Sequence, residues 1–340
     1  MRYRQKVTVL LCLAAVLTCG YILTLVFDPE RSGRRSDAYT WLDPGLRDSV
    51  DRVDFNGGES GRSMGALSLL RRNGRWVALR EGIEYPAREA RVDELLDLLS
   101  RRASYPRRSD SSAGHGLFGL SETTASRITL RGGAGLPLLD LLIGTSDSGG
   151  GSLYMRKAGG SEVRSGDGGL SAYIDNEPGS WYDLRLFPET GEGRVTPDLV
   201  QRLTVFLPAQ ALQDAWTEGL TMLISRVGNG WRIDAGDRSP DPGDIEKSRV
   251  DSYISGILAT TGDDFVPPPV LSGEQALILE LGDGRVLSLH LGPPGEDGQR
   301  QAWIFGPLEG RGGVTEPAYG YALAAWALDR IFRPPEYFKK

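Results

Sequence analysis

The chain has 340 residues, of which 40% are apolar and 25% are charged, the balance of an ordinary globular protein. Its formal net charge of −6 lacks the basic excess that a nucleic-acid-binding face requires, so we expect no nucleic-acid partner. Both cysteines, Cys12 and Cys19, lie in the first apolar stretch, so the rest of the chain can form neither a disulfide nor a thiolate metal site.

The first element is an uncharged stretch from Val7 to Phe27, VTVLLCLAAVLTCGYILTLVF. As a helix rising 1.5 Å per residue, about 21 residues span the hydrocarbon core of a bilayer, which is ~30 Å thick. Basic residues at positions 2, 4 and 6 precede it, and acidic residues at 28 and 30 follow it. The positive-inside rule then predicts a single-pass anchor in the cytoplasmic (inner) membrane, with the N-terminus in the cytoplasm and the bulk of the chain outside. A cleaved signal peptide or a lipoprotein signal at Cys19 is the alternative, but no good cleavage site follows the stretch.

After a polar stalk at residues 28–47, one pattern of elements occurs twice, in modules at 48–190 and 191–340. Alternating strands at 50–55 and 66–72 match strands at 200–206 and 221–227, and an Asn-Gly hairpin turn follows in each copy, at 73–74 and 229–230. A helix follows in each module, and then a hairpin and a further strand, at 119–157 and 270–305. We therefore predict an α+β fold of two tandem, duplicated β-rich modules with one main helix each; chance similarity between two α/β stretches is the alternative.

Apolar residues at helical spacing define the main helix of each module. The first stripe is Val92, Leu95, Leu96 and Leu99, and the second is Val250, Tyr253, Ile254, Ile257 and Leu258. A tryptophan follows each hairpin turn, and we expect Trp76 and Trp231 to pack between the sheet and the helix of their modules. The same spacing predicts a C-terminal helix over 315–332, with Thr315 as its N-cap and Trp326 on a face that packs on the second module or binds a partner.

The order of several short motifs resembles a bacterial family called domain of unknown function 4340. The motifs are Trp-x-x-Leu at 76–79, Tyr85-Pro86-Ala87, a leucine-rich helix, GLFGLSE at 116–122, LLIG at 141–144, Tyr-x-Arg at 154–156 and WYDLRLF at 181–187. The resemblance covers residues 50–190 well and the second half more loosely. It implies a membrane-anchored envelope protein associated with gliding-motility-type ABC transporters, and the family brings no catalytic residues with it.

The search for chemistry in the sequence gives mostly negative results. Residues 61–65 match G-x-S-x-G, but a polar segment precedes them where a nucleophile elbow requires a strand. His115 and His290, the two histidines, stand apart from any cluster of zinc-ligand spacing, and no nucleotide-binding or calcium motif is present. Glu122 and Glu274 occupy equivalent places after Leu-Ser, where turn formation accounts for them. We expect no catalytic residues, no metal and no cofactor.

The sequence points instead to binding. We predict a non-enzymatic, membrane-anchored envelope protein that acts as a scaffold or recognition subunit of an ABC-type transport complex, with membrane-transport proteins as partners. Arg185, Arg194 and Trp326 are the candidate interface residues, because a cleft where two modules join favours binding. Arg101, Arg102, Arg107 and Arg108 form a basic cluster after the first helix, read either as a solvated helix end or as a surface for an anionic partner. An envelope hydrolase using paired carboxylates is the alternative function.

Overall fold

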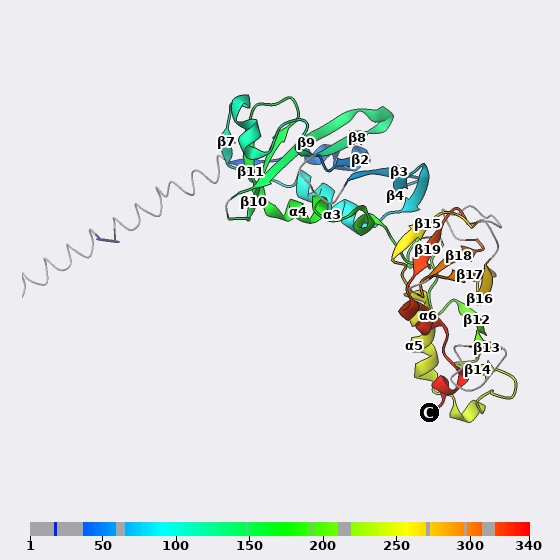
Figure 1. Cartoon of the computed structure of the whole chain (residues 1–340). Helices are drawn as coiled ribbons and strands as arrows, with labels where there is room; N and C mark the ends of the chain where they lie inside the picture. Colours follow the sequence, from blue (N-terminus) through cyan, green and yellow to red (C-terminus); the bar gives the residue numbers. More distant parts are fainter. Residues whose placement is uncertain are drawn as a thin grey trace, which may run out of the picture. The chain divides into compact units, whose positions relative to one another are not determined.

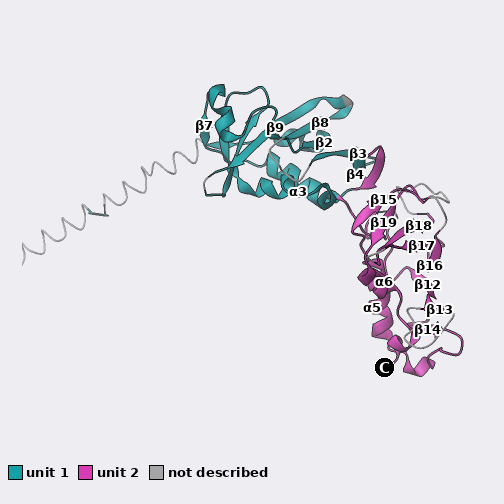
Figure 2. Ribbon diagram, viewed as in Figure 1, with its two compact units in different colours: residues 1–80, 87–181 teal, residues 81–86, 182–340 magenta. Residues whose placement is uncertain are grey.

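The computed structural model describes residues 17–18, 37–58, 65–147, 149–191, 193–209, 219–269, 273–295, 298–307 and 317–340 (Figure 1). Two compact units divide the chain: residues 1–80 with 87–181, and residues 81–86 with 182–340 (Figure 2). The predicted anchor at 7–27 lies outside the described residues, apart from 17 and 18. No helix among the described residues is long and apolar enough to cross a membrane.

The first unit is an antiparallel sheet with helices on one face (Figure 1). Its strands lie in the order β4-β3-β2-β8-β9-β10-β11-β7, and β1 pairs separately with β6. The strands are β1 (Ala38–Tyr39), β2 (Val50–Asn56), β3 (Ala66–Arg72), β4 (Arg75–Arg80), β6 (Ala103–Ser104), β7 (Arg107–Ser109), β8 (Ser126–Gly132), β9 (Pro137–Ser146), β10 (Ser152–Lys157) and β11 (Val163–Asp167). The α-helices are α3 (Glu89–Ser100) and α4 (Ser171–Ile174), with short 3₁₀ turns η1 (Pro44–Ser49), η2 (Ser112–Phe118), η3 (Gly133–Gly135), η4 (Gly168–Leu170) and η5 (Pro178–Trp181).

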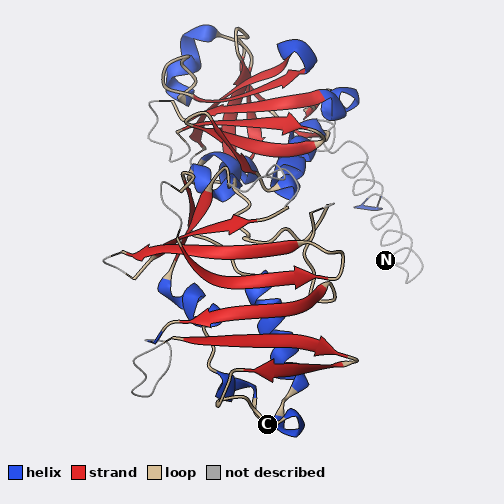
Figure 3. Ribbon diagram, turned by 90° about the vertical axis from the view of Figure 1, so that its right-hand side faces the viewer, coloured by secondary structure: helices blue, strands red, loops and turns tan. Residues whose placement is uncertain are grey.

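The second unit is also an antiparallel sheet, with its strands side by side and its helices against one face (Figure 3). The strand order is β14-β13-β12-β16-β17-β18-β19-β15. These strands are β12 (Val200–Leu207), β13 (Leu220–Val227), β14 (Gly230–Asp234), β15 (Asp264–Val266), β16 (Glu274–Leu281), β17 (Val286–Pro294), β18 (Arg300–Phe305) and β19 (Gly320–Leu323). The helices are α5 (Lys247–Leu258) and α6 (Ala325–Ile331), with 3₁₀ turns η7 (Pro242–Asp244) and η8 (Pro335–Phe338). β5 (Ile83–Pro86) groups with this unit.

The fold is thus a mixed α and β one, built mainly from antiparallel sheets with few helices, and this part of the predicted fold class is confirmed. The strands occupy matching places in the two sheets: β2, β3 and β4 correspond to β12, β13 and β14, and β8 to β11 correspond to β16 to β19. In both units a short strand between the main helix and the next long hairpin, β7 or β15, ends the order beside β11 or β19. No sequence pattern predicted several short strands, among them β7, β11, β15 and β19.

The main helices follow their apolar stripes. All the predicted stripe residues of α3 and α5 are buried, and α3 packs against β4 as α5 packs against β14. Trp76 on β4 is 5% exposed and Trp231 on β14 is 8% exposed. The indole Nε1 of Trp231 donates to Asp251 Oδ1 of α5 at 2.7 Å, so this ring joins the sheet to the helix.

One of the two predicted hairpin turns is shifted by a residue. Arg72 pairs with Arg75, so Asn73 and Gly74 form the first turn, and both have the positive φ of a type I′ turn. In the second hairpin Val227 pairs with Gly230, so the turn is formed by Gly228 and Asn229, and 229–230 was the wrong pair. Of these two residues Gly228 has positive φ, which fits a type II′ turn with glycine at its first central position.

The predicted C-terminal helix over 315–332 is wrong at Gly320–Leu323, which form strand β19 between β18 and β15, and its predicted N-cap, Thr315, lies outside the described residues. Tyr321 and Leu323 are both buried, two residues apart, which is the spacing of side chains on one face of a strand. The helical prediction for this tyrosine- and alanine-rich segment did not take that spacing into account. Helix α6 begins only at Ala325, and Trp326 is 49% exposed on it.

An aromatic cluster forms one part of the core of the second unit. It contains Tyr85, Tyr182, Phe265, Tyr319 and Tyr321, all buried. The rings of Tyr85 and Phe265 stack with centroids 4.7 Å apart, and Tyr182 lies 5.4 Å from Phe265. Tyr85 comes from the Tyr-Pro-Ala motif and Tyr182 from WYDLRLF, so two motifs of the sequence meet in this core.

Candidate functional site

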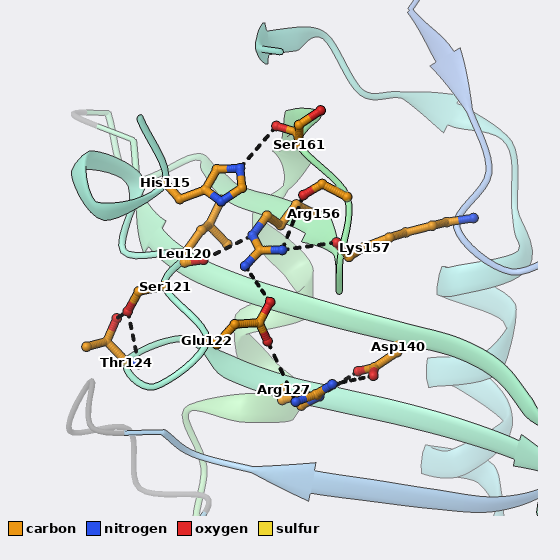
Figure 4. A network of polar contacts seen from close by, with 11 residues as sticks. His115, Leu120, Ser121, Glu122, Thr124, Arg127, Asp140, Arg156, Lys157 and Ser161 are labelled. Atoms are coloured by element: carbon orange, nitrogen blue, oxygen red, sulfur yellow. Dashed lines mark hydrogen bonds and ion pairs between the residues drawn. The ribbon is translucent and has the colours of Figure 1, made fainter. Parts of the chain in front are cut away.

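A polar network centred on a buried arginine joins two motifs in the first unit (Figure 4). Arg156 of β10 is 3% exposed. Its Nε donates to Leu120 O at 3.0 Å, its Nη2 to Glu122 Oε1 at 2.8 Å, and its Nη1 to the carbonyls of Lys157 and Gly160 at 3.3 Å. The Tyr-x-Arg strand thus holds the GLFGLSE loop in place.

The network continues across strands β8 and β9. Glu122 also faces Arg127 Nη1 at 3.8 Å, and Arg127 binds Asp140 with two nitrogens, of which Nε lies 2.6 Å from Oδ1. The guanidinium of Arg127 holds the pKa of the Asp140 carboxyl below its usual range, and a hydrogen bond from Thr129 adds to this effect. Each carboxylate of the network is therefore paired with arginine, an arrangement suited to holding a loop.

The backbone around this loop is also closely packed. A Cβ atom on Gly144 of the LLIG motif would lie 2.0 Å from Phe118 O, so this position accepts only glycine. Ser121 Oγ accepts the backbone N–H of Thr124 at 3.2 Å, the turn bond that the sequence predicted for this serine. His115 lies on η2, and its Nε2 is 3.1 Å from Ser161 O. We interpret the network as a structural clamp.

The second unit contains a groove of about 1630 Å³, which we call the proline groove. It lies where strands β12, β16, β17 and β18 begin or end, beside helix α6. Prolines supply much of its wall, at positions Pro208, Pro267, Pro268, Pro293, Pro294 and Pro334. Pro208 follows the end of β12, Pro267 and Pro268 follow β15, and Pro294 is the last residue of β17. Because proline lacks a backbone N–H, it is favoured where strand pairing stops, and these residues give the groove a stiff, apolar lining.

Trp303 of β18 fixes one side of the proline groove. Its Nε1 donates to Pro267 O at 3.2 Å, which ties the segment after β15 to the sheet. A Cβ atom on Gly320 would lie 2.4 Å from Cδ1 and Nε1 of Trp303, so β19 must carry glycine opposite the indole. Arg300, at the start of the same strand, donates from Nε to Gly292 O at 2.6 Å and from Nη2 to Glu274 Oε2 at 3.2 Å.

The charged groups of the proline groove are of both signs. Glu274 and Asp329 contribute carboxylates, and Arg300 and Arg333 contribute guanidinium groups. Glu274 is 87% exposed, whereas a catalytic carboxylate is ordinarily desolvated within its cleft. Among the described residues, no group of three or more histidine, cysteine or acidic side chains could hold a metal ion. The groove thus combines apolar walls with charges of both signs.

The predicted interface residues lie at separate places in the second unit. Arg185 pairs with Glu189, and its backbone bridges to Thr261. Arg194 is exposed in the segment before β12, and its carbonyl accepts Arg285 Nη2 at 2.7 Å. Trp326 is covered on one face by the guanidinium of Arg330, 4.8 Å from the ring centroid. None of the three lines the proline groove as the structure describes it.

Other sequence candidates have plain structural surroundings. His290 on β17 lies against Phe305, with Nδ1 3.2 Å from Gly273 O and Nε2 3.1 Å from Ser288 Oγ. The G-x-S-x-G match lies outside the described residues except for Gly65. Sequence reasoning missed the proline groove, although the Pro-Pro pairs at 267–268 and 293–294 were a visible signal.

The comparisons with known proteins give a single match. A model of the family described as Domain of unknown function (DUF4340) matches residues 76–276, more than half of the chain. Neither a curated protein nor a solved structure matches the chain. The matched region contains Arg156 and its network, and it extends to the start of β16 in the second unit.

Proposed function

Since the chain belongs to the family described as Domain of unknown function (DUF4340), whose description states no activity, we propose a function from the chain's own features. The protein is a non-enzymatic component of the cell envelope, anchored in the cytoplasmic membrane by residues 7–27. It acts as a scaffold or recognition subunit of an ABC-type transport complex. It holds a partner protein through the proline groove of the second unit.

The size and lining of the proline groove are the observation that carries this proposal. Small-molecule sites usually enclose about 300–1000 Å³, whereas this groove has about 1630 Å³. Trp303 supplies an aromatic wall of the kind on which extended peptides dock, and the prolines beside it keep the groove stiff and apolar. The carboxylates of Glu274 and Asp329 would favour basic side chains in such a peptide. The guanidinium groups of Arg300 and Arg333 would favour acidic side chains.

We also propose that the two units arose by duplication of one module. The matching strand order of the two sheets and the equivalent places of α3 and α5 support a common origin. The two copies have diverged in function. The first keeps the Arg156 clamp, and the second has the proline groove, so we assign partner binding to the second copy.

Photo-crosslinking tests the binding proposal. A photoreactive phenylalanine analogue at Gln301, an exposed residue of the groove, should crosslink to a membrane-transport protein in intact cells. The control carries the same analogue at Val227, which is 59% exposed on the β13–β14 hairpin of the same unit. Equal crosslinking from both positions, or none from Gln301, would show that the groove does not hold a partner.

The hydrolase alternative has one supporting observation, since the carboxylates of Glu274 and Asp329 line the same groove. The variants E274Q and D329N separate the two functions. If the groove binds a peptide, each change alters crosslinking moderately and the purified protein turns over no envelope polymer. If the protein is a hydrolase, one of these changes abolishes a measurable turnover, and the binding proposal is then wrong.

The topology is tested separately. Protease added to spheroplasts should digest the chain beyond residue 28, because the proposed anchor leaves it outside the cytoplasm. Full protection of the chain would place it inside the cell. A mature form that lacks residues 1–27 would show that the apolar stretch is a signal peptide and not an anchor.

A further inference from the structure

The point at which the chain enters the first unit is fixed by several contacts. Asp37 O accepts the backbone N–H of Tyr105 at 2.8 Å, and β1 pairs with β6 through Tyr39 and Ala103. The ring of Tyr39 also packs edge-on against Trp41, with centroids 5.0 Å apart. Whatever precedes residue 37 is therefore joined to a firmly held place on this unit.

Cations lie on the entry point and on the strands next to it. The guanidinium of Arg164 lies 4.1 Å from the ring centroid of Tyr39, and Lys157 Nζ lies 5.8 Å from it. Arg102 directly precedes β6, the partner of β1, and Arg108 lies on β7 beside β11, where its Nε donates to Ser165 Oγ at 2.7 Å. Arg102, Arg108 and Lys157 are all exposed, and we call these three residues the entry surface.

The neighbouring cations are already neutralised, but the entry surface is not. Arg101 pairs with Asp167 at 2.7 Å, and both Arg107 and Arg164 pair with Glu162, at 2.8 and 2.6 Å. Within the described part of the chain, no ion pair joins an acidic side chain to Arg102, Arg108 or Lys157. Three positive charges therefore remain available to an anionic partner.

The sequence places this surface close to a membrane. Only residues 28–36 separate the apolar stretch from Asp37, and an extended chain covers at most about 3.6 Å per residue, so Asp37 lies within roughly 35 Å of the end of the anchor. We infer that the entry surface binds the anionic phosphate headgroups of the membrane that holds the anchor, and so orients the first unit on the bilayer. This inference rests on the membrane anchoring proposed above.

The magnitude follows from the electrostatics of anionic bilayers. Each lysine or arginine near such a surface strengthens binding by roughly five-fold, so removal of all three should weaken docking by roughly a hundred-fold. The attraction is also screened, because the Debye length is about 8 Å at physiological ionic strength and about 3 Å at 1 M salt. Docking should therefore be lost in concentrated salt.

The test uses the full chain in nanodiscs, either of phosphatidylcholine alone or with added phosphatidylglycerol. Amide hydrogen exchange of residues 101–109 and 152–157 should be several-fold slower in the anionic discs. The triple variant R102Q/R108Q/K157Q should remove this difference. The control R71Q/R72Q/R75Q removes as many charges on β3 and β4, at the other end of the strand order, and should leave the difference unchanged.

Each other outcome has a definite meaning. Equal exchange in the two kinds of disc, or loss of the difference in the control variant as well, overturns the inference. Equal slowing by inorganic phosphate in neutral discs would assign the surface to a soluble anion and also overturn it. If the chain fails to co-elute with discs of either composition, the anchoring proposal fails instead, because that result does not depend on lipid charge.

Discussion

Replacing Arg156 by methionine tests whether the clamp between β10 and the GLFGLSE loop stabilises the first unit. Methionine keeps most of the apolar stem but removes every hydrogen bond that the guanidinium makes to Leu120, Lys157, Gly160 and Glu122. The carbonyl of Leu120 is then left buried without this donor. An unsatisfied buried acceptor costs about 1–3 kcal/mol.

The ion pair with Glu122 adds less. The side chain of Glu122 is about half exposed, so water can solvate its carboxylate once the arginine is gone. A pair of this kind contributes about 0–1 kcal/mol. We therefore expect R156M to lower the free energy of unfolding of the first unit by about 3 kcal/mol. With a urea dependence of about 2 kcal/mol per molar, the midpoint falls by about 1.5 M.

Pulse proteolysis across a urea series measures this change, because the fragments released identify which unit has unfolded. The matched control is R52M on β2, where an exposed arginine pairs with Asp54 at 2.8 Å. That change should cost less than about 1 kcal/mol. If R156M shifts the first-unit midpoint no more than R52M does, the buried network is not a clamp and the reasoning is wrong. A shift confined to the second unit would refute it equally.

Three further predictions follow from single side chains. Trp231→Ala should cost about 3–5 kcal/mol in a urea melt and Trp326→Ala less than about 0.5, because one ring is buried and the other half exposed; similar costs would contradict the packing described. Arg127 depresses the pKa of Asp140 in the folded protein, so the stability that this pair contributes is present above about pH 4, the pKa of an aspartate in the unfolded chain. That stability is lost as the pH falls through the lower pKa of the folded protein. D140N should therefore make the urea midpoint less sensitive to acid, and an unchanged acid sensitivity would refute this. Burial raises the pKa of Tyr105 to about 12, and the nearby Asp167 adds to the rise. The stability that protonated Tyr105 contributes is therefore complete below about pH 10 and is lost as the pH rises toward 12. Y105F should reduce this alkaline destabilisation, and an absorbance titration of the variant should lack one late-ionising tyrosine that the wild type shows.

The sequence by itself determined the elements whose signals are local. The stripes of α3 and α5 specify helices because burial of one face of a helix depends only on the spacing of apolar residues along it. The strands that border Asn73-Gly74 were equally plain, because the two turn residues fix the positive φ that a tight hairpin needs. The family was also recognisable from motif order alone, since no tertiary contact is needed to read it.

Only the tertiary structure decided the elements that depend on distant partners. Strand β19 exists because β18 and β15 lie on either side of it, and its residues taken alone also fit a helical pattern. Short strands such as β7 gain their hydrogen bonds from β11, more than fifty residues away, so nothing in their own few residues identifies them. The contact of Arg156 with Glu122 and the proline groove beside Trp303 arise in the same way. A groove of this kind is assembled from strand ends that the sheet brings together, and strand pairing at long sequence separation is the information that a local pattern lacks.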